Sequence, residues 1–168
     1  LARTVAFGGR TLGDDSAKYL NSPETGLFSK SRVLYGFDQA RRAIEKQRTA
    51  IIVEGYMDAV LLVQHGFDQV VATLGTALTD AHVKLLRPLA TQVYLCFDSD
   101  AAGVRAADRA VELALRAQID VRVVALEDKD PADCVVASGA EGFQQRLKSA
   151  VDALQFKWSQ TVTSLDGG

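Results

Sequence analysis

The stretches VEGYMD at residues 53–58 and FDSDAAG at residues 97–103 decide how this chain folds. Each places acidic residues directly after an apolar run, over 50–53 in the first case and 92–97 in the second. Such runs are typical of buried strands in a parallel sheet. The carboxyl ends of parallel strands lie at one edge of a sheet, and ligands bind in the crevice outside that edge. We therefore expect the acidic residues to converge there.

The residue types at this edge indicate a metal site. Oxygen ligands that leave coordination positions open suit Mg²⁺ or Mn²⁺ and do not suit zinc. Asp98 and Asp100 would repel each other unless a cation or protons offset their charge. The pattern therefore indicates metal-assisted chemistry on phosphates. Structural roles are the alternative: Glu54 and Asp100 could each cap a following helix, and Asp58 could reach the site or face solvent.

From residue 49 onward, strand and helix patterns alternate. The expected strands are 50–54, 69–73, 92–97 and 121–126. The expected helices are 38–46, 56–65, one from residue 79 or 80 to 86, 101–117, a short one from 130, and 142–158. This alternation predicts parallel strands joined by right-handed crossovers. Residues 4–7 predict a further strand, followed by a turn at residues 8–9.

Several strings, taken in order, resemble a known family. A Glu-Gly after one strand and an Asp-x-Asp after a later one resemble the TOPRIM domain of primases, topoisomerases and some nucleases. Six strings narrow this to the TOPRIM-containing catalytic core of bacterial DnaG-type replicative primases: FGGR at 7–10, KYLNSPET at 18–25, LYG at 34–36, VEGYMD at 53–58, LGT at 74–76 and DP at 130–131. The resemblance extends to about Trp158.

The resemblance implies a fold and a set of site residues. The fold is α/β, with a TOPRIM-like, mostly parallel sheet flanked by helices and a partial N-terminal α+β segment. The cofactor is Mg²⁺ or Mn²⁺. The implied catalytic residues are Glu54, Asp98 and Asp100, and the implied metal ligands are these three together with Asp130. The segment 74–76 is expected to form part of the wall of the active site.

The third acidic motif departs from the family pattern. DnaG-type primases usually have Asp-Pro-Asp where this chain has Asp130, Pro131 and Ala132. Asp130 carries over, but the second Asp is lost at Ala132. Asp133 could replace it as a metal ligand from the next helical position, although its side chain would point in another direction.

Residues near the N-terminus are the candidates for binding nucleotide and DNA. Residues 1–48 carry nine Lys or Arg and five Asp or Glu, a net charge of +4, whereas the remainder carries −6. This asymmetry allows a basic segment to hold a polyanion beside an acidic, metal-binding segment. By resemblance, the binding residues are Arg10, Lys18, Tyr19, Asn21 and Lys30, and the ring of Tyr19 is suited to stacking on a base.

The other potential ligands have no spacing that suits a metal site. Cys96 and Cys134 are expected to be reduced and structural, as in a cytoplasmic protein. His65 and His82 are expected on helix surfaces. No run is long and apolar enough to span a membrane, and no signal peptide is visible.

The resemblance implies three parts and one function. Residues 1–48 are expected to be a partial N-terminal basic subdomain, 49–140 the TOPRIM domain, and 141–168 a C-terminal helix and tail that begin a helical subdomain. The expected enzyme is a DNA primase, a DNA-directed RNA polymerase that makes short RNA primers by metal-dependent nucleotidyl transfer. Its expected partners are a single-stranded DNA template, ribonucleoside triphosphates and, through a region outside this chain, the replicative helicase. The segment alone is expected to be impaired.

Two other functions stay open on the sequence. Another TOPRIM enzyme, a nuclease or topoisomerase module, would share the acidic motifs, although the string at 18–25 favours a primase. A non-catalytic module that binds a nucleotide or an alarmone would tolerate the loss at Ala132. Primer synthesis, DNA cleavage, and nucleotide binding without product would distinguish the three.

Overall fold

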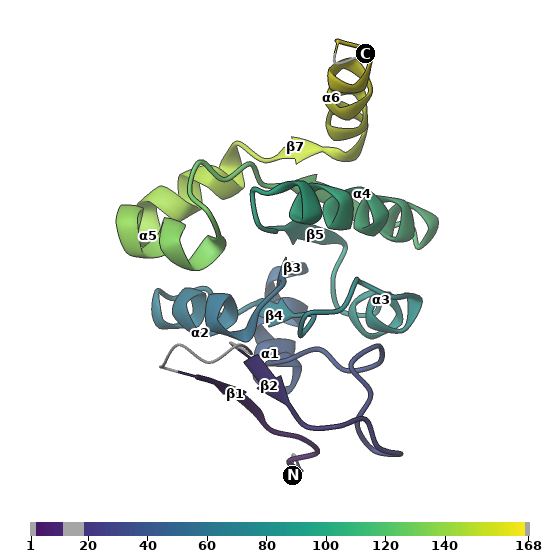
Figure 1. Ribbon diagram of the computed structural model, residues 1–168, viewed down its shortest axis with the longest axis vertical. Coiled ribbons are helices and arrows are strands. Elements are labelled where there is room, and N and C mark those ends of the chain that lie inside the picture. Colours follow the sequence, from purple (N-terminus) through teal and green to yellow (C-terminus); the bar gives the residue numbers. More distant parts are fainter. Residues whose placement is uncertain (1–2, 12–18, 167–168) are drawn as a thin grey trace.

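A computed structural model describes residues 3–11 and 19–166 (Figure 1). The core of the fold is a five-stranded sheet. The strand order is β4-β3-β5-β6-β7. The first four strands are parallel, and β7 pairs antiparallel with β6. The strands are β3 (Thr49–Val53), β4 (Val70–Ala72), β5 (Gln92–Leu95), β6 (Asp120–Val123) and β7 (Val151–Asp152). The predicted α/β class and mostly parallel sheet are confirmed.

Helices cover both faces of this sheet because successive side chains of a buried strand point to opposite faces. Ile52 packs in a core with helices α1, α3, α4 and α6, whereas Ile51 and Val53 pack in a second core with α2 and α5. The helices are α1 (Phe37–Gln47), α2 (Tyr56–Gln64), α3 (Asp80–Leu86), α4 (Ala101–Arg116), α5 (Pro131–Lys148) and α6 (Ala153–Asp166). The strand ends thus lie between two helical layers.

The C-terminal part differs from the prediction. A single helix over 142–158 is wrong, because strand β7 separates α5 from α6. Val151 pairs with Val123 at the sheet edge, and the Asp152 carboxylate accepts a hydrogen bond from the Gln155 amide at 2.8 Å, which caps the new helix. Helix α5 also runs across the boundary predicted at 140, with a kink at Gly139. The three-part division stays a prediction.

The N-terminal part forms a hairpin of strands β1 (Gly8–Arg10) and β2 (Tyr19–Asn21). The strand predicted over 4–7 and the turn predicted at 8–9 are therefore wrong. The backbone of Phe7 is held by Ser22 at the end of the hairpin, and the two glycines pair within the strand. Glycine in a strand often marks a close approach of another group.

His82 is fully buried, so its predicted surface position is wrong. Its Nδ1 accepts from the Thr79 amide at 3.3 Å, so Nε2 carries the proton and donates to the Lys30 carbonyl at 2.8 Å. Thr79 is the N-cap of α3. The buried ring therefore joins α3 to the segment before α1.

Cys96 and Cys134 are both buried and are not joined in a disulfide. That they are reduced and structural stays a prediction. Within residues 3–11 and 19–166, no helix combines the length and apolar character needed to cross a membrane.

Candidate active site

A cavity of about 400 Å³ lies where the predicted acidic residues converge. Its walls come from the loops that follow β3, β4, β5 and β6 and from the hairpin β1–β2. The acidic residues that line it are Glu54, Asp58, Asp98, Asp130 and Asp133. The other polar residues that line it are Arg10, Tyr19, Asn21, Tyr56 and Lys129. Acidic and basic parts of the chain therefore share one cavity.

Among the predicted site residues that the structure describes, all but two line this cavity. Asp100 and Lys30 are not among the lining residues, and Lys18 falls outside the described residues. Leu74 and Gly75, from the segment predicted to form a wall, do line it. Asp58, Tyr56 and Lys129 also line it, although the sequence analysis did not assign them to the site.

Glu54 follows β3 and links the first acidic loop to the second. Its Oε1 accepts a hydrogen bond from the amide of Asp98 at 3.3 Å. The alternative role as a cap of α2 falls to Asp58 instead. Burial raises the pKa of Glu54, and the negative charge of Asp98 raises it further. Glu54 is therefore a carboxyl group with an increased tendency to hold a proton.

Asp58 is buried and links the first acidic loop to the third. Its Oδ2 accepts from the Gly55 amide at 3.1 Å, and its Oδ1 accepts from the Ala132 amide at 3.3 Å. Burial, followed by the charges of Asp130 and Asp98, raises the pKa of Asp58 to about 6. The spacing of four residues from Glu54 was the sequence signal for this position, but that spacing alone could not separate a site residue from a solvent-exposed one.

Asp98 is held at its strand end by direct packing of α4. A Cβ added to Gly103 would lie 2.0 Å from the Asp98 carbonyl oxygen, so only glycine permits this approach. Asp100 is the N-cap of α4, and its Oδ1 accepts from the amides of Ala102 and Gly103 at 2.8 Å each. Burial, then the charges of Asp130 and Asp100, raise the pKa of Asp98.

The third acidic loop is fixed where it enters helix α5, through contacts of Lys129 and Asp130. Asp130 caps α5, its Oδ1 accepting from the Asp133 amide at 2.8 Å. The Lys129 carbonyl accepts from the amide and the hydroxyl of Ser99, at 3.1 and 3.3 Å. These contacts hold the loop against the one that carries Asp98.

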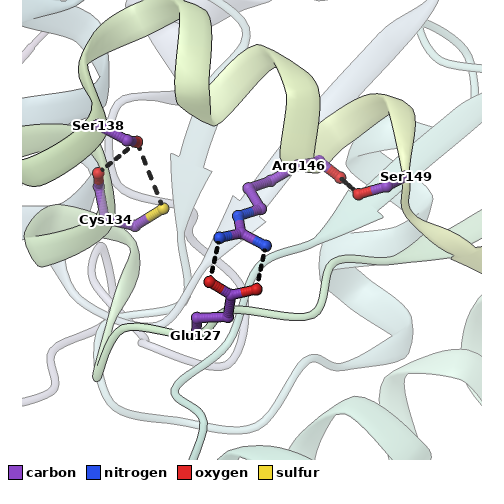
Figure 2. A network of polar contacts seen from close by, with 5 residues as sticks. All are labelled: Glu127, Cys134, Ser138, Arg146 and Ser149. Carbon is purple, nitrogen blue, oxygen red and sulfur yellow. Dashed lines mark hydrogen bonds and ion pairs between the residues drawn. The ribbon is translucent and has the colours of Figure 1, made fainter.

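Figure 2 shows how the same loop is attached to the second half of α5. Arg146 donates to both carboxylate oxygens of Glu127, at 2.9 and 2.6 Å. The pair is exposed, so it fixes geometry more than it contributes stability. Nearer the kink, the Ser138 hydroxyl donates to the Cys134 carbonyl at 2.8 Å.

The donor set fits a hard divalent cation in its chemistry. All the acidic ligands are oxygens, and the pKa values of Asp98 and Glu54 are raised by neighbouring carboxylates as well as by burial. A cation would relieve this repulsion. In the described part of the chain, no three His, Cys, Asp or Glu side chains are arranged to hold a metal as they stand. The support for Glu54 and Asp98 as metal ligands therefore comes from the cavity that they share and from its negative charge. It does not come from an already formed coordination sphere.

The carboxylate cluster should make stability depend on pH. Because the pKa of Asp58 rises from 3.8 to about 6 on folding, the folded chain holds a proton that the unfolded chain releases. This contribution is complete below pH ~4 and is lost as pH rises through about 6, by roughly 1–3 kcal/mol without metal. Asp58→Asn should remove it. Urea unfolding from pH 4 to 7 gives the free energy of unfolding of the wild type and of Asp58→Asn. Subtracting one pH profile from the other also removes the opposite contribution of buried His82, which both forms share. Parallel pH profiles for the two forms would contradict the prediction.

Known families match two regions of the chain. The Toprim domain matches residues 48–125, and the N-terminal domain of the DNA primase catalytic core matches residues 1–41. The DNA primase of Deinococcus radiodurans is 42% identical over 159 residues, which cover 94% of this chain and 28% of that protein. The DNA primase of Escherichia coli K12 is 41% identical, covering 98% of this chain and 29% of that protein. The chain thus spans less than a third of these relatives.

Solved structures agree with the sequence matches. A DnaG primase catalytic domain bound to single-stranded DNA superimposes with a TM-score of 0.88 at 39% identity, covering 96% of this chain and 52% of that one. A DNA primase domain from Pseudomonas aeruginosa gives a TM-score of 0.87 at 42% identity, covering 95% and 51%. These matches include both the hairpin and the sheet.

Proposed function

Because the chain belongs to the DnaG-type DNA primases and carries the Toprim domain of their catalytic core, we propose that it forms the nucleotidyl-transfer site of a primase. The reaction joins ribonucleotides into a short RNA primer on a single-stranded DNA template. The observation that carries this proposal is the cavity in which acidic loops from three strand ends face a basic and aromatic hairpin.

We propose that a divalent cation, Mg²⁺ or Mn²⁺, is held by Glu54, Asp98 and Asp130, with Asp100 and Asp133 at the margin. When bound, the cation would stabilise the negative charge that develops on the transferred phosphate. Asp100 and Asp130 each use one oxygen for a helix N-terminus, which fixes the direction of their carboxylates. The acidic set is therefore held largely by backbone contacts.

Glu54 is the proposed acid or base of the reaction. The 3′-hydroxyl of a primer must lose its proton to attack the incoming nucleotide. A carboxylate whose pKa is raised toward neutrality accepts a proton more readily than an ordinary one. The hydrogen bond from the Asp98 amide holds Oε1 of Glu54 in place, and Glu54 itself lines the cavity.

The opposite wall would bind the nucleic acid and the triphosphate. On that wall Arg10 supplies positive charge, and Tyr19, which is 43% exposed, offers a ring face for stacking. Lys129, in the third acidic loop, adds a second positive charge to the cavity. Arg10 also lies over that ring, 5.5 Å from its centroid. Lys18 and Lys30 remain part of the proposed binding track on sequence resemblance. The replicative helicase is proposed as a partner of the longer primase, through a region outside this chain.

Replacing Arg10 with alanine should weaken binding of a single-stranded oligonucleotide and reduce its salt dependence. Each phosphate contact to a single strand contributes about −0.7 to the slope of log K against log salt. Arg116→Ala is the matched comparison, because Arg116 is exposed at the C-terminal end of α4 and does not line the cavity. Fluorescence anisotropy from low to high salt measures both. Unchanged affinity and slope for Arg10→Ala would exclude a phosphate contact at this residue.

The function is tested by primer synthesis with the chain extended to the length of its curated relatives. Template DNA, ribonucleoside triphosphates and Mg²⁺ should give short RNA products, and Glu54→Gln should abolish them. DNA cleavage in place of RNA synthesis would indicate a nuclease. Nucleotide binding without any product would indicate a binding module. Either result would overturn the proposed function.

A further inference from the structure

Tyr56 connects the hairpin to the acidic loop. It is the residue after Gly55 in the first acidic loop and begins helix α2. Its hydroxyl donates to the Gly9 carbonyl in β1 at 2.6 Å. A residue next to the proposed catalytic carboxylate therefore binds the strand that carries Arg10.

The ring of Tyr56 lies between two other tyrosines. Tyr19, from β2, meets it edge-on with 5.2 Å between centroids, and Tyr35 lies at 5.7 Å on a tilted ring. Tyr35 is itself fixed to the sheet, because its backbone exchanges hydrogen bonds of 2.9 and 3.1 Å with Ala72 of β4. The three rings thus form a continuous contact from the hairpin to the edge of the main sheet.

The hairpin backbone approaches the Tyr56 ring closely at one glycine. A Cβ added to Gly8 would lie 3.3 Å from Cε1 of Tyr56 and 3.2 Å from Oδ1 of Asn21. At Gly9 the nearest atom to an added Cβ is the Leu20 carbonyl oxygen at 3.9 Å, which is an ordinary contact. The hairpin therefore contacts the Tyr56 ring closely at Gly8, whereas a methyl group at Gly9 could be accommodated.

We propose that Tyr56 is a positioning residue that seats the hairpin β1–β2 on the acidic cavity and so sets where Arg10 meets an anionic ligand. The proposal rests on the proposed function for the nature of that ligand, a nucleic-acid or nucleotide phosphate. Arg10 stacks on Tyr19, and Tyr19 contacts Tyr56, so displacement of the hairpin from Tyr56 moves the guanidinium. Tyr56 needs no contact with the ligand for this role.

The proposal makes the contribution of Arg10 depend on Tyr56. In the wild type, Arg10→Ala should weaken binding of a labelled oligothymidylate. In a Tyr56→Ala background, the same change should have little further effect, because the guanidinium is already displaced. Tyr56→Ala alone should lower affinity by about three- to tenfold, the loss expected for one hydrogen bond and its packing. Tyr56→Phe keeps the ring and should recover part of this loss.

Two glycine variants test the same seat without altering Tyr56. They are made in an Asn21→Ala background, because Asn21 is the other side chain that a methyl group on Gly8 would meet. There Gly8→Ala should push the hairpin from the ring and reduce oligonucleotide affinity, whereas Gly9→Ala should bind like the background protein. This pair remains informative if Tyr56→Ala fails to fold. The rise in Tm caused by Mg²⁺ should be kept in the two glycine variants and in Arg10→Ala, because these changes lie outside the acidic loops.

These experiments distinguish a failure of the proposed function from a failure of the positioning role of Tyr56. If the wild type shows neither an Mg²⁺-induced Tm rise nor oligonucleotide binding, the proposed function fails. If the wild type binds, but the effect of Arg10→Ala is the same with and without Tyr56, the positioning role is overturned. Equal binding by Gly8→Ala and Gly9→Ala would overturn it as well. A loss confined to Gly8→Ala and to the Tyr56 variants supports it.

Discussion

Replacing Gly103 with alanine is expected to destabilise the protein, although glycine to alanine inside a helix normally stabilises by about 1 kcal/mol. The added methyl group would lie 2.0 Å from the carbonyl oxygen and 2.8 Å from the carbonyl carbon of Asp98. Neither atom can move without shifting the end of β5 or helix α4. We expect a loss of roughly 3 kcal/mol, seen as a fall in Tm on the order of 10 °C.

The same substitution should impair the site more than the fold. A shift of about 1 Å in reacting groups costs ~10²-fold in rate, and Asp98 is the residue displaced. Gly26→Ala is the control, since nothing lies within 4 Å of the added methyl group. Thermal melts are measured on both variants of this chain, and primer synthesis on the same variants of the chain extended to the length of its relatives. A Gly103→Ala protein as stable as the control would show that α4 does not rest on the Asp98 backbone.

Asp98→Asn is expected to have a large effect on activity. The change removes a proposed metal ligand but leaves the Asp98 amide free to bind Glu54. Loss of metal stabilisation at the reacting phosphate is worth several kcal/mol, so primer synthesis should fall by at least about 10³-fold. Stability without metal should be kept or rise slightly, because one of the mutually repelling charges of the cluster is gone.

The diagnostic measurement is a melting titration with Mg²⁺ or Mn²⁺. A ligand at 100 times its Kd stabilises the folded state by about 2.7 kcal/mol. The wild type should show this rise and Asp98→Asn should not. Asp68→Asn, an exposed position before β4 that does not line the cavity, is the matched control and should behave like the wild type. An unchanged titration in Asp98→Asn would remove this residue from the metal site.

The sheet and the convergence of the acidic loops could be predicted because both depend on local patterns. Apolar runs ended by turns predicted the four parallel strands to within three residues. The topology rule for parallel strands then places Glu54, Asp98 and Asp130 at one edge. The structure brings all three to one cavity. Their role in binding metal stays a prediction.

The errors concern contacts between distant segments, which no local pattern encodes. Val151 enters a strand because it pairs with Val123, and the helical spacing around it carried no sign of this. His82 is buried because two backbone groups satisfy its ring. Tyr56 was missed as a link because its partner, the Gly9 carbonyl, is a backbone atom far away in the sequence.

The parallel pairing of the sheet also determines when the cavity can form during folding. Ala50 of β3 pairs with Val93 of β5, and Val93 pairs with Val121 of β6, so each step closes a long segment of chain. Such non-local pairing slows folding. During synthesis Glu54 and Asp98 emerge first, and the cavity is completed only when β6 and Asp130 join them. A cation that needs all three loops would therefore bind after the last parallel strand has paired, and would stabilise finished chains without trapping partly folded ones.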